Sequence, residues 1–371
     1  ICRIVGLIAL PLWGLAARRR PLHQLVATGL CAAAVVDVFL GFAPGYAAFT
    51  ALSAASVAAN AALLLAYPAF IAEHTRTAAE EQSDAEHAEL AAVRSIVVVF
   101  HVAAVAATLV GAGVLALPDP RLGVSSFAVV DVVLAVLILR VLRRLPARQG
   151  KPARPAAPAP VRRRWALLAQ AALIGVAFDF ALAVARPFFT EFAEGLGSGS
   201  AGGAVLFFLP SVGALATLPF ARRCHDRFGH RMLPVAALVC AGGFLWQYTA
   251  GGLPSLVGGR LLAGLGLGLA QVAVEMRMFH STGTAGPAFT AVETVRSAGL
   301  LAAPLISAAV VSHDLALPLT VAAAALACVA VASLAPARRA ARTPAAAATP
   351  LTPAEPLAVT VPDGLPVHAK E

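Results

Sequence analysis

Long apolar runs separated by short polar or basic segments dominate the sequence. A helix that crosses a bilayer needs about 20 mostly apolar residues, and eleven runs approach or reach that length. They cover about residues 1–17, 25–43, 48–72, 95–116, 125–142, 165–189, 203–221, 232–250, 254–278, 287–311 and 316–335. This pattern predicts an all-α, polytopic membrane protein, a two-lobed bundle of about eleven transmembrane helices.

The composition agrees with a protein that lies in a lipid bilayer. Hydrophobic residues make up 59% and charged residues 13% of the chain, whereas a soluble domain carries about 25% charged residues. The net charge of +9 comes from arginines in the short segments between apolar runs, so it does not indicate nucleic-acid binding. The five cysteines are scattered without the spacing of a metal site or a disulfide framework. We expect no cofactor and no bound metal.

The arginines also predict the orientation in the membrane. Four segments are rich in arginine and are expected on the same side: 18–20, 140–164, 222–231 and 338–342. Cytoplasmic loops carry an excess of Lys and Arg, so this side is the cytoplasmic one. The prediction is a multi-pass protein of the cell membrane with a cytoplasmic C-terminus.

Proline and arginine between residues 143 and 164 predict an extended cytoplasmic linker that divides the chain. Residues 1–142 would form an N-terminal lobe of five spans, and residues 165–336 a C-terminal lobe of six. Residues 337–371, rich in Ala and Pro, read as a disordered cytoplasmic tail.

An internal repeat supports this division. Glu73 and Glu275 lie 202 positions apart, and so do Arg94 and Arg296, each pair beside the ends of matching spans. The same shift leaves the sixth span without a counterpart, so we expect a first helix to be missing before Ile1. Two six-helix halves would then form parallel repeats.

The segment 222–231, between the seventh and eighth spans, is predicted to be a tight basic loop at the membrane surface. Its order Asp226-Arg227-x-Gly229-x-Arg231 resembles the signature loop of the major facilitator superfamily, usually written Gly-x-x-x-Asp-Arg-x-Gly-Arg followed by Arg or Lys. The resemblance implies a transporter that works by alternating access, with Asp226 as a latch. Its partners would be an arginine of the loop, the start of the fourth span near Arg94, or a helix N-terminus. The alternative is a loop that only sets topology.

Polar residues within the spans are costly in lipid, so each is a functional candidate. The resemblance places the third, sixth and ninth spans around a central cavity. The candidates for a substrate or proton pathway are Asn60, His101, Asp179, Arg186, Arg260 and Gln271. We expect Glu73, Arg94, Glu275 and Arg296 to form charge networks with a gating role beside the cytoplasmic loops.

Each candidate has a structural alternative. Asp179 and Arg186 lie seven residues apart on one helix face and could form a buried pair. Arg260, in a glycine-rich run that resembles a second pattern of the family, could snorkel to the membrane surface. His101 could be a packing histidine. Asp37 and Asp131 fall towards the outer ends of their spans, where capping at the interface is expected.

No motif of a hydrolase, nucleotide-binding loop or zinc enzyme occurs in the sequence, so an enzyme is not expected. The predicted function is secondary active transport of a small molecule, narrowed to proton-coupled export of an amphipathic compound. An uptake permease for a sugar or metabolite and a non-transporting receptor or scaffold remain the alternatives.

Overall fold

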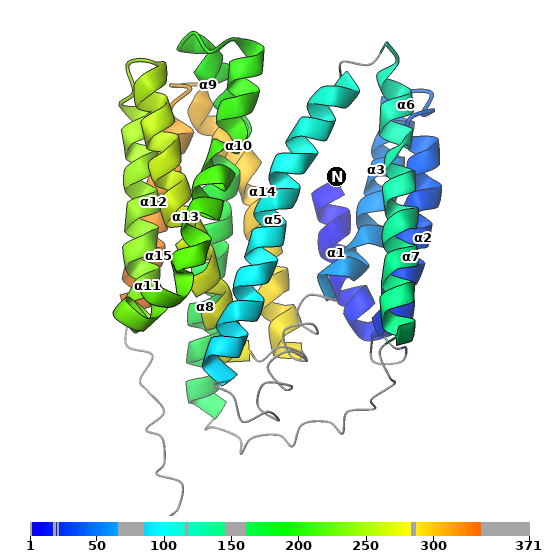
Figure 1. Cartoon of the computed structure of the whole chain (residues 1–371), viewed down its shortest axis with the longest axis horizontal. Coiled ribbons are helices and arrows are strands. Elements are labelled where there is room, and N and C mark those ends of the chain that lie inside the picture. The colour runs from blue at the N-terminus through cyan, green and yellow to red at the C-terminus, as the bar shows by residue number, and fades with distance from the viewer. Residues whose placement is uncertain are drawn as a thin grey trace, which may run out of the picture. The chain divides into compact units, whose positions relative to one another are not determined.

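The structure is a computed structural model that describes residues 2–17, 20, 22–65, 85–115, 118–144, 161–282 and 287–334. Within these ranges every regular element is a helix, and eleven have at least 15 residues (Figure 1). The long helices are α1 (Cys2–Ala16), α2 (Leu22–Leu40), α3 (Tyr46–Asn60), α5 (Ala85–Leu115), α7 (Phe127–Arg144), α8 (Val161–Val184), α10 (Gly199–Thr217), α12 (Met232–Tyr248), α13 (Leu253–Thr282), α14 (Pro287–Val311) and α15 (Leu317–Leu334). The short elements are η1 (Ala61–Leu65), α6 (Pro120–Ser125), α9 (Phe189–Gly195), η2 (Leu218–Phe220), α11 (Ala221–Phe228) and η3 (Gly229–Arg231).

These helices confirm the predicted all-α membrane class. Eight segments of the described chain are long and apolar enough to cross a membrane, and one of them, Ala201–Tyr248, contains both α10 and α12. Two shorter apolar helices, α1 and α2, complete the set of eleven spans. The surface of α7 carries Val129, Val133 and Leu137, each about half exposed. A soluble monomer rarely exposes so continuous an apolar face, so this face suits contact with lipid.

Small residues let the helices of the second half pack closely. The largest core joins α8, α12, α13 and α15, and Ala181, Ala237, Ala270 and Ala322 within it are completely buried. Helix association in lipid depends on such close packing, because lipid tails are as apolar as the side chains themselves.

The glycine-rich run of α13 contacts two neighbouring helices at once. A Cβ atom at Gly264 would lie 2.4 Å from the carbonyl oxygen of Pro210 in α10. A Cβ atom at Gly266 would lie 2.4 Å from the backbone nitrogen of Cys240 in α12. No side chain fits at either distance, so both glycines are required for the approach of the backbones. The glycine-rich run is therefore the surface through which α13 packs against α10 and α12.

Contacts between helices that are distant in sequence bring charged residues from different helices close together. Helix α5 packs against α10 and α13, and α1 packs against α14. Helix α8 packs against α13, α14 and α15, while α2 packs against α3 and α7. The polar side chains described below lie on these helix pairs.

The predicted tight loop at 222–231 is instead mostly helical, which corrects the expectation. Helix α11 occupies Ala221–Phe228 because that stretch contains neither Gly nor Pro, so helix continues beyond η2. It ends at Gly229, whose φ of +51° lies in the left-handed region that glycine adopts without steric cost. The turn is therefore limited to the glycine and the residues that follow it.

The fourth span begins earlier than hydropathy indicates, since α5 starts at Ala85 and carries acidic residues in its first turns. The third span, expected to reach residue 72, is helical as α3 to Asn60 and continues as the 3₁₀ element η1. Residues 66–84, most of the predicted linker and the predicted tail lie outside the described residues. The division into lobes stays a prediction.

Candidate functional site

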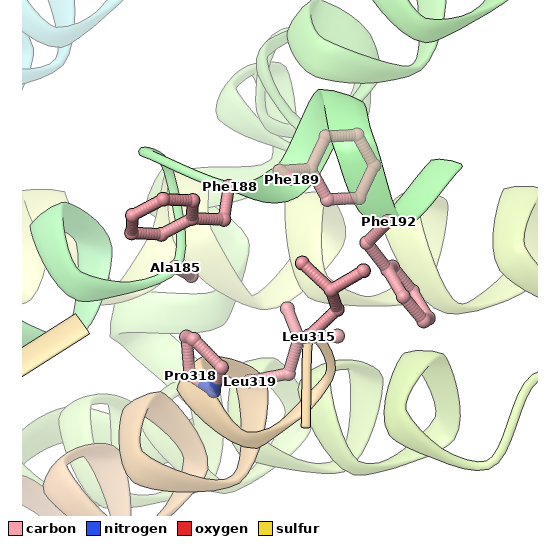
Figure 2. Close-up of a pocket in the computed structure, with 7 residues that line it drawn as sticks. All are labelled: Ala185, Phe188, Phe189, Phe192, Leu315, Pro318 and Leu319. Carbon is pink, nitrogen blue, oxygen red and sulfur yellow. The ribbon is translucent and has the colours of Figure 1, made fainter. Parts of the chain in front are cut away.

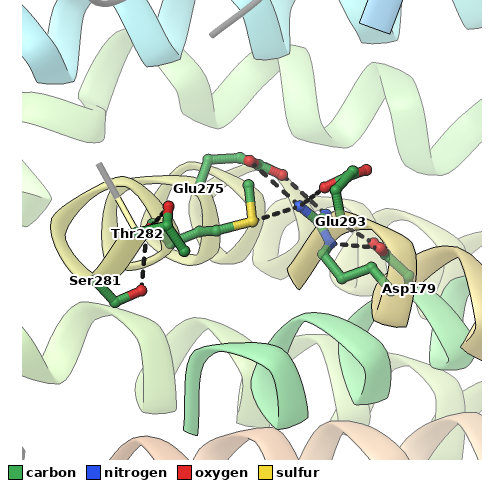
Figure 3. Close-up of polar contacts among 7 residues, drawn as sticks. Asp179, Glu275, Ser281, Thr282 and Glu293 are labelled. Carbon is green, nitrogen blue, oxygen red and sulfur yellow. Dashed lines mark hydrogen bonds and ion pairs between the residues drawn. The ribbon is translucent and has the colours of Figure 1, made fainter. Parts of the chain in front are cut away.

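A buried arginine joins three helices of the second half. Arg296 of α14 is 7% exposed, and its guanidinium contacts carboxylates from α8, α13 and α14 (Figure 3). Its Nε and Nη2 atoms donate to the two oxygens of Asp179 at 2.8 and 3.2 Å. Nη2 also donates to Glu275 Oε1 at 3.0 Å, and Nη1 donates to Glu293 Oε2 at 3.2 Å. The paired bonds to Asp179 have the two-pronged geometry that makes Arg–carboxylate contacts strong.

A glycine on α8 provides the space for this arginine. A Cβ atom at Gly175 would lie 2.7 Å from Cδ of Arg296, so a side chain at that position would displace the arginine stem. Gly175 precedes Asp179 by one helical turn, so the same face of α8 offers both the gap and the carboxylate. Helix α8 therefore provides both the space for the Arg296 side chain and a carboxylate that binds its guanidinium.

The charges of this cluster, which we call the Arg296 network, do not balance. Asp179, Glu275 and Glu293 together with Arg296 would carry a net charge of −2 if all four were ionised. Excess charge within membrane-spanning helices is costly, and binding a proton reduces it.

The Arg296 network combines residues that the sequence analysis kept apart. Asp179 is bonded to Arg296, whereas the sequence analysis considered Arg186 as its partner. Arg296 and Glu275, predicted for gating beside the loops, are in direct contact and buried. Glu293 was not identified from the sequence, although its position three residues before Arg296 is a spacing at which helical side chains meet.

The second buried arginine has no carboxylate partner within the described chain and bonds to backbone. Arg260 of α13 is 5% exposed, and its Nε and Nη2 atoms donate to the carbonyl oxygens of Leu206 and Phe207 in α10, each at 2.9 Å. Pro210 has no N–H to donate to the Leu206 carbonyl, so Arg260 supplies the missing donor. The guanidinium also lies 3.7 Å from the ring centroid of Phe189. Arg260 therefore does not snorkel to the membrane surface. Its contacts stabilise the packing of α13 against α10 and α9.

Three histidine–carboxylate contacts connect the start of α5 to α11 and the end of α13. Asp226 Oδ1 lies 3.1 Å from His87 Nε2, and His225 Nε2 lies 3.1 Å from Glu86 Oε1. His280 Nε2 of α13 lies 3.3 Å from Glu89 Oε2. We call these contacts the histidine clamp. The start of the fourth span was one of the partners predicted for Asp226, but the residue is His87, not Arg94.

The other residues of the signature segment are exposed or end the helix. Arg227 and Arg231 are exposed, and Gly229 makes the turn after α11. Arg94 is half-buried on α5, and Glu73 lies outside the described residues.

Two polar side chains lie on the packed helices α5 and α13. His101 is only 2% exposed, and neither ring nitrogen makes a sound hydrogen bond within the described residues. The Oε1 atom of Gln271 is also buried without such a bond. Asn60 ends α3 and donates to Ser56 Oγ at 3.5 Å, and Arg186 follows α8 with an exposed side chain. Of the predicted pathway residues, His101 and Gln271 are therefore those with unused bonding capacity.

A small apolar pocket lies where α8, α9 and α15 meet, lined by Ala185, Phe188, Phe189, Phe192, Leu315, Pro318 and Leu319 (Figure 2). The space inside it admits little more than one water molecule, far below the roughly 300–1,000 Å³ of typical ligand pockets. It is therefore too small to hold a substrate in this conformation.

No protein-family model and no curated protein sequence matches the chain. Among solved structures, the chain is similar to the human organic anion transporter MFSD10 (TETRAN), with a TM-score of 0.66 and 17% sequence identity. The match covers 90% of this chain and 82% of that one. The chain therefore has the fold of the major facilitator superfamily transporters, as the signature segment predicts.

Proposed function

We propose that the protein is a secondary active transporter that moves a small molecule across the cell membrane by alternating access. The Arg296 network is the observation that supports coupling to protons most directly. It places three carboxylates and one arginine in membrane-spanning helices, with an excess of two negative charges that protons can reduce. A proton-coupled transporter needs such a group, one whose charge changes as a proton binds and leaves.

Apolar and polar side chains on the packed helices support an amphipathic substrate. Phe188, Phe189 and Phe192 lie together after α8, while His101 on α5 and Gln271 on α13 have buried polar atoms without a hydrogen bond. The solved structure with the similar fold is titled an organic anion transporter, so amphipathic organic anions are the first compounds to test. Export in exchange for protons is the proposed direction.

The histidine clamp is proposed as the gate of this transporter. It joins α5 to α11 and α13 through side chains that are partly exposed, such as Asp226 at 51%. Contacts of this kind are individually weak, so they can break and form again in each transport cycle. The predicted orientation places this gate on the cytoplasmic side.

The test is flux in proteoliposomes that contain the full-length protein and a pH-sensitive dye. A panel of fluorescent amphipathic anions is loaded, and release is followed with and without an imposed proton gradient. We expect release to accelerate with the gradient and proton movement to accompany it. Asp179→Asn should abolish the effect of the gradient, whereas the exposed Glu191→Gln should not. If the gradient does not change the rate of release in either protein, the proposed coupling to protons is wrong. If no compound of the panel is released, the proposed transport of amphipathic anions is wrong.

A further inference from the structure

The guanidinium of Arg296 does not bind the three carboxylates of its network equally (Figure 3). Asp179 accepts through both oxygens, at 2.8 Å from Nε and 3.2 Å from Nη2. Glu275 also faces the guanidinium with both oxygens, at 3.0 Å from Nη2 and 3.5 Å from Nη1. Among the described contacts, Glu293 reaches it through one oxygen, Oε2, at 3.2 Å from Nη1. Glu293 is therefore the carboxylate that the arginine binds least.

The nitrogen that contacts Glu293 is also shared with other acceptors. Nη1 of Arg296 carries two hydrogens, and it lies 3.1 Å from Met278 Sδ, 3.2 Å from Glu293 Oε2 and 3.5 Å from Glu275 Oε2. Two hydrogens cannot give each of three acceptors a bond of its own. Glu275 keeps its separate bond from Nη2, so the competition weakens the contact of Glu293 most.

The cations on the neighbouring helices have other partners. The helices packed against α14 are α1, α8, α13 and α15. Apart from the network itself, the ionisable side chains that the structure describes on them are those of Arg260, Arg277, His280, Cys2 and Cys328. Arg260 and Arg277 donate to backbone carbonyls of α10 and α15, and His280 belongs to the histidine clamp. Within the described residues, Arg296 is thus the cation that compensates Glu293.

A carboxylate with few bonds to a cation and with other carboxylates nearby binds a proton most readily. Glu293 meets both conditions, and its side chain is the most exposed of the three, at 23% against 18% for Asp179 and 9% for Glu275. We propose that Glu293 is the proton-binding residue of the Arg296 network, while Asp179 and Glu275 stay ionised and hold the guanidinium. The proton adds to a carboxyl oxygen of Glu293, which changes the net charge of the network from −2 to −1. This assignment rests on the proposed coupling to protons and names the group that carries it.

The experiment uses the full-length protein in lipid nanodiscs, with infrared spectra recorded across a pH series. Protonated carboxyl groups give a carbonyl band, and part of that band should disappear in the wild type as rising pH removes the proton from Glu293. Glu293→Gln keeps the shape of the side chain and an acceptor oxygen for Nη1, so it is expected to fold. Its spectra should lack this titrating part of the band. Glu191→Gln, which changes an exposed acid on α9, should match the wild type.

The other two acids of the network provide the matched comparison. Asp179→Asn and Glu275→Gln should keep the titrating band, because Glu293 is still present. Its midpoint should lie lower by about one pH unit or more, since each variant removes a neighbouring negative charge. A proton that is bound more weakly near neutral pH agrees with the loss of coupling expected for Asp179→Asn.

Two results would overturn the proposal. If the titrating band persists in Glu293→Gln and is lost in Asp179→Asn or Glu275→Gln, that other residue binds the proton. If the spectra of the wild type and all three variants are the same, no carboxyl group of the network does. The spectra need no transport substrate, so they are judged separately from flux. If Glu293→Gln removes the band while flux in the wild type is independent of the gradient, the assignment stands and the proposed coupling is wrong.

Discussion

Two groups of acids in membrane-spanning helices differ in how their charge is balanced. Asp179 lies against Arg296, with Glu275 and Glu293 completing the cluster, so three carboxylates share one guanidinium. Asp37 of α2 and Asp131 of α7 lie on two helices that pack together, and one carboxylate oxygen of each is buried without a hydrogen-bond partner among the described residues. The first group binds its acids through an arginine, and the second leaves buried oxygens without a bond. An acid in a span is thus not one kind of site, and its partner decides its chemistry.

Removing the arginine is expected to have the largest effect. Arg296→Met would leave three carboxylates, one buried and two partly buried, without their cation, and breaking a buried ion pair in this way costs about 3–5 kcal/mol. We expect a large fall in thermal stability and in the monodisperse fraction of purified protein. Arg231→Met, at an exposed position, should stay within about 0.5 kcal/mol of the wild type.

A second substitution separates charge from packing in that result. If the loss comes from uncompensated charge, adding Asp179→Asn and Glu275→Gln to Arg296→Met should recover part of the stability. No recovery would mean that Arg296 acts mainly through the volume it fills beside Gly175.

Arg260 provides a third way of balancing a buried charge, through backbone carbonyls. Arg260→Met keeps an apolar stem but leaves the carbonyls of Leu206 and Phe207 without donors. An unsatisfied buried acceptor costs about 1–3 kcal/mol, so we expect a smaller loss of thermal stability than for Arg296→Met. Equal losses of thermal stability in Arg260→Met and Arg296→Met would contradict the distinction between backbone and carboxylate partners. Arg227→Met, at an exposed position, is the control.

Much of the fold could be predicted from the sequence, but the charge partners could not. Hydropathy identifies the eleven spans, because length and composition alone decide whether a helix suits a bilayer. The contact between Asp179 and Arg296 joins residues 117 positions apart, and helix periodicity says nothing about such pairs. Periodicity suggested Arg186 instead, because it considers only one helix.

Two further differences between the sequence analysis and the structure have local causes. Snorkelling was considered as the alternative role of Arg260 because its position in the span was assessed without Pro210, whose missing N–H leaves an acceptor in α10. Helix α11 was expected to be a loop because basic residues were taken as a mark of the membrane surface. Charged residues such as Arg222 and Arg223 are compatible with helix, and only Gly229 ends it.

The smallest effect on stability is expected at the histidine clamp, where the contacts are exposed to solvent. Asp226→Asn removes the charge but keeps the shape of the side chain that contacts His87. An exposed pair contributes about 0.2–1 kcal/mol, so folding should be almost unaffected. Such an energy still shifts a two-state equilibrium by up to about fivefold, since 1.4 kcal/mol corresponds to tenfold. Because histidine is charged only when protonated, the contact should strengthen as pH falls.

The shift can be measured through Asn60→Cys in a protein without its native cysteines, labelled from each side of the membrane. Asp226→Asn and His87→Gln should change the ratio of labelling in the same direction, and the double variant should add little, because both remove the same contact. Gln24→Ala is the matched control: Gln24 lies 202 positions before Asp226, at the corresponding place in the first half, and its side chain is exposed. We expect that control to leave the ratio unchanged at every pH. If all three variants behave alike while expression stays normal, the segment at α11 sets only the topology, and the gate lies elsewhere.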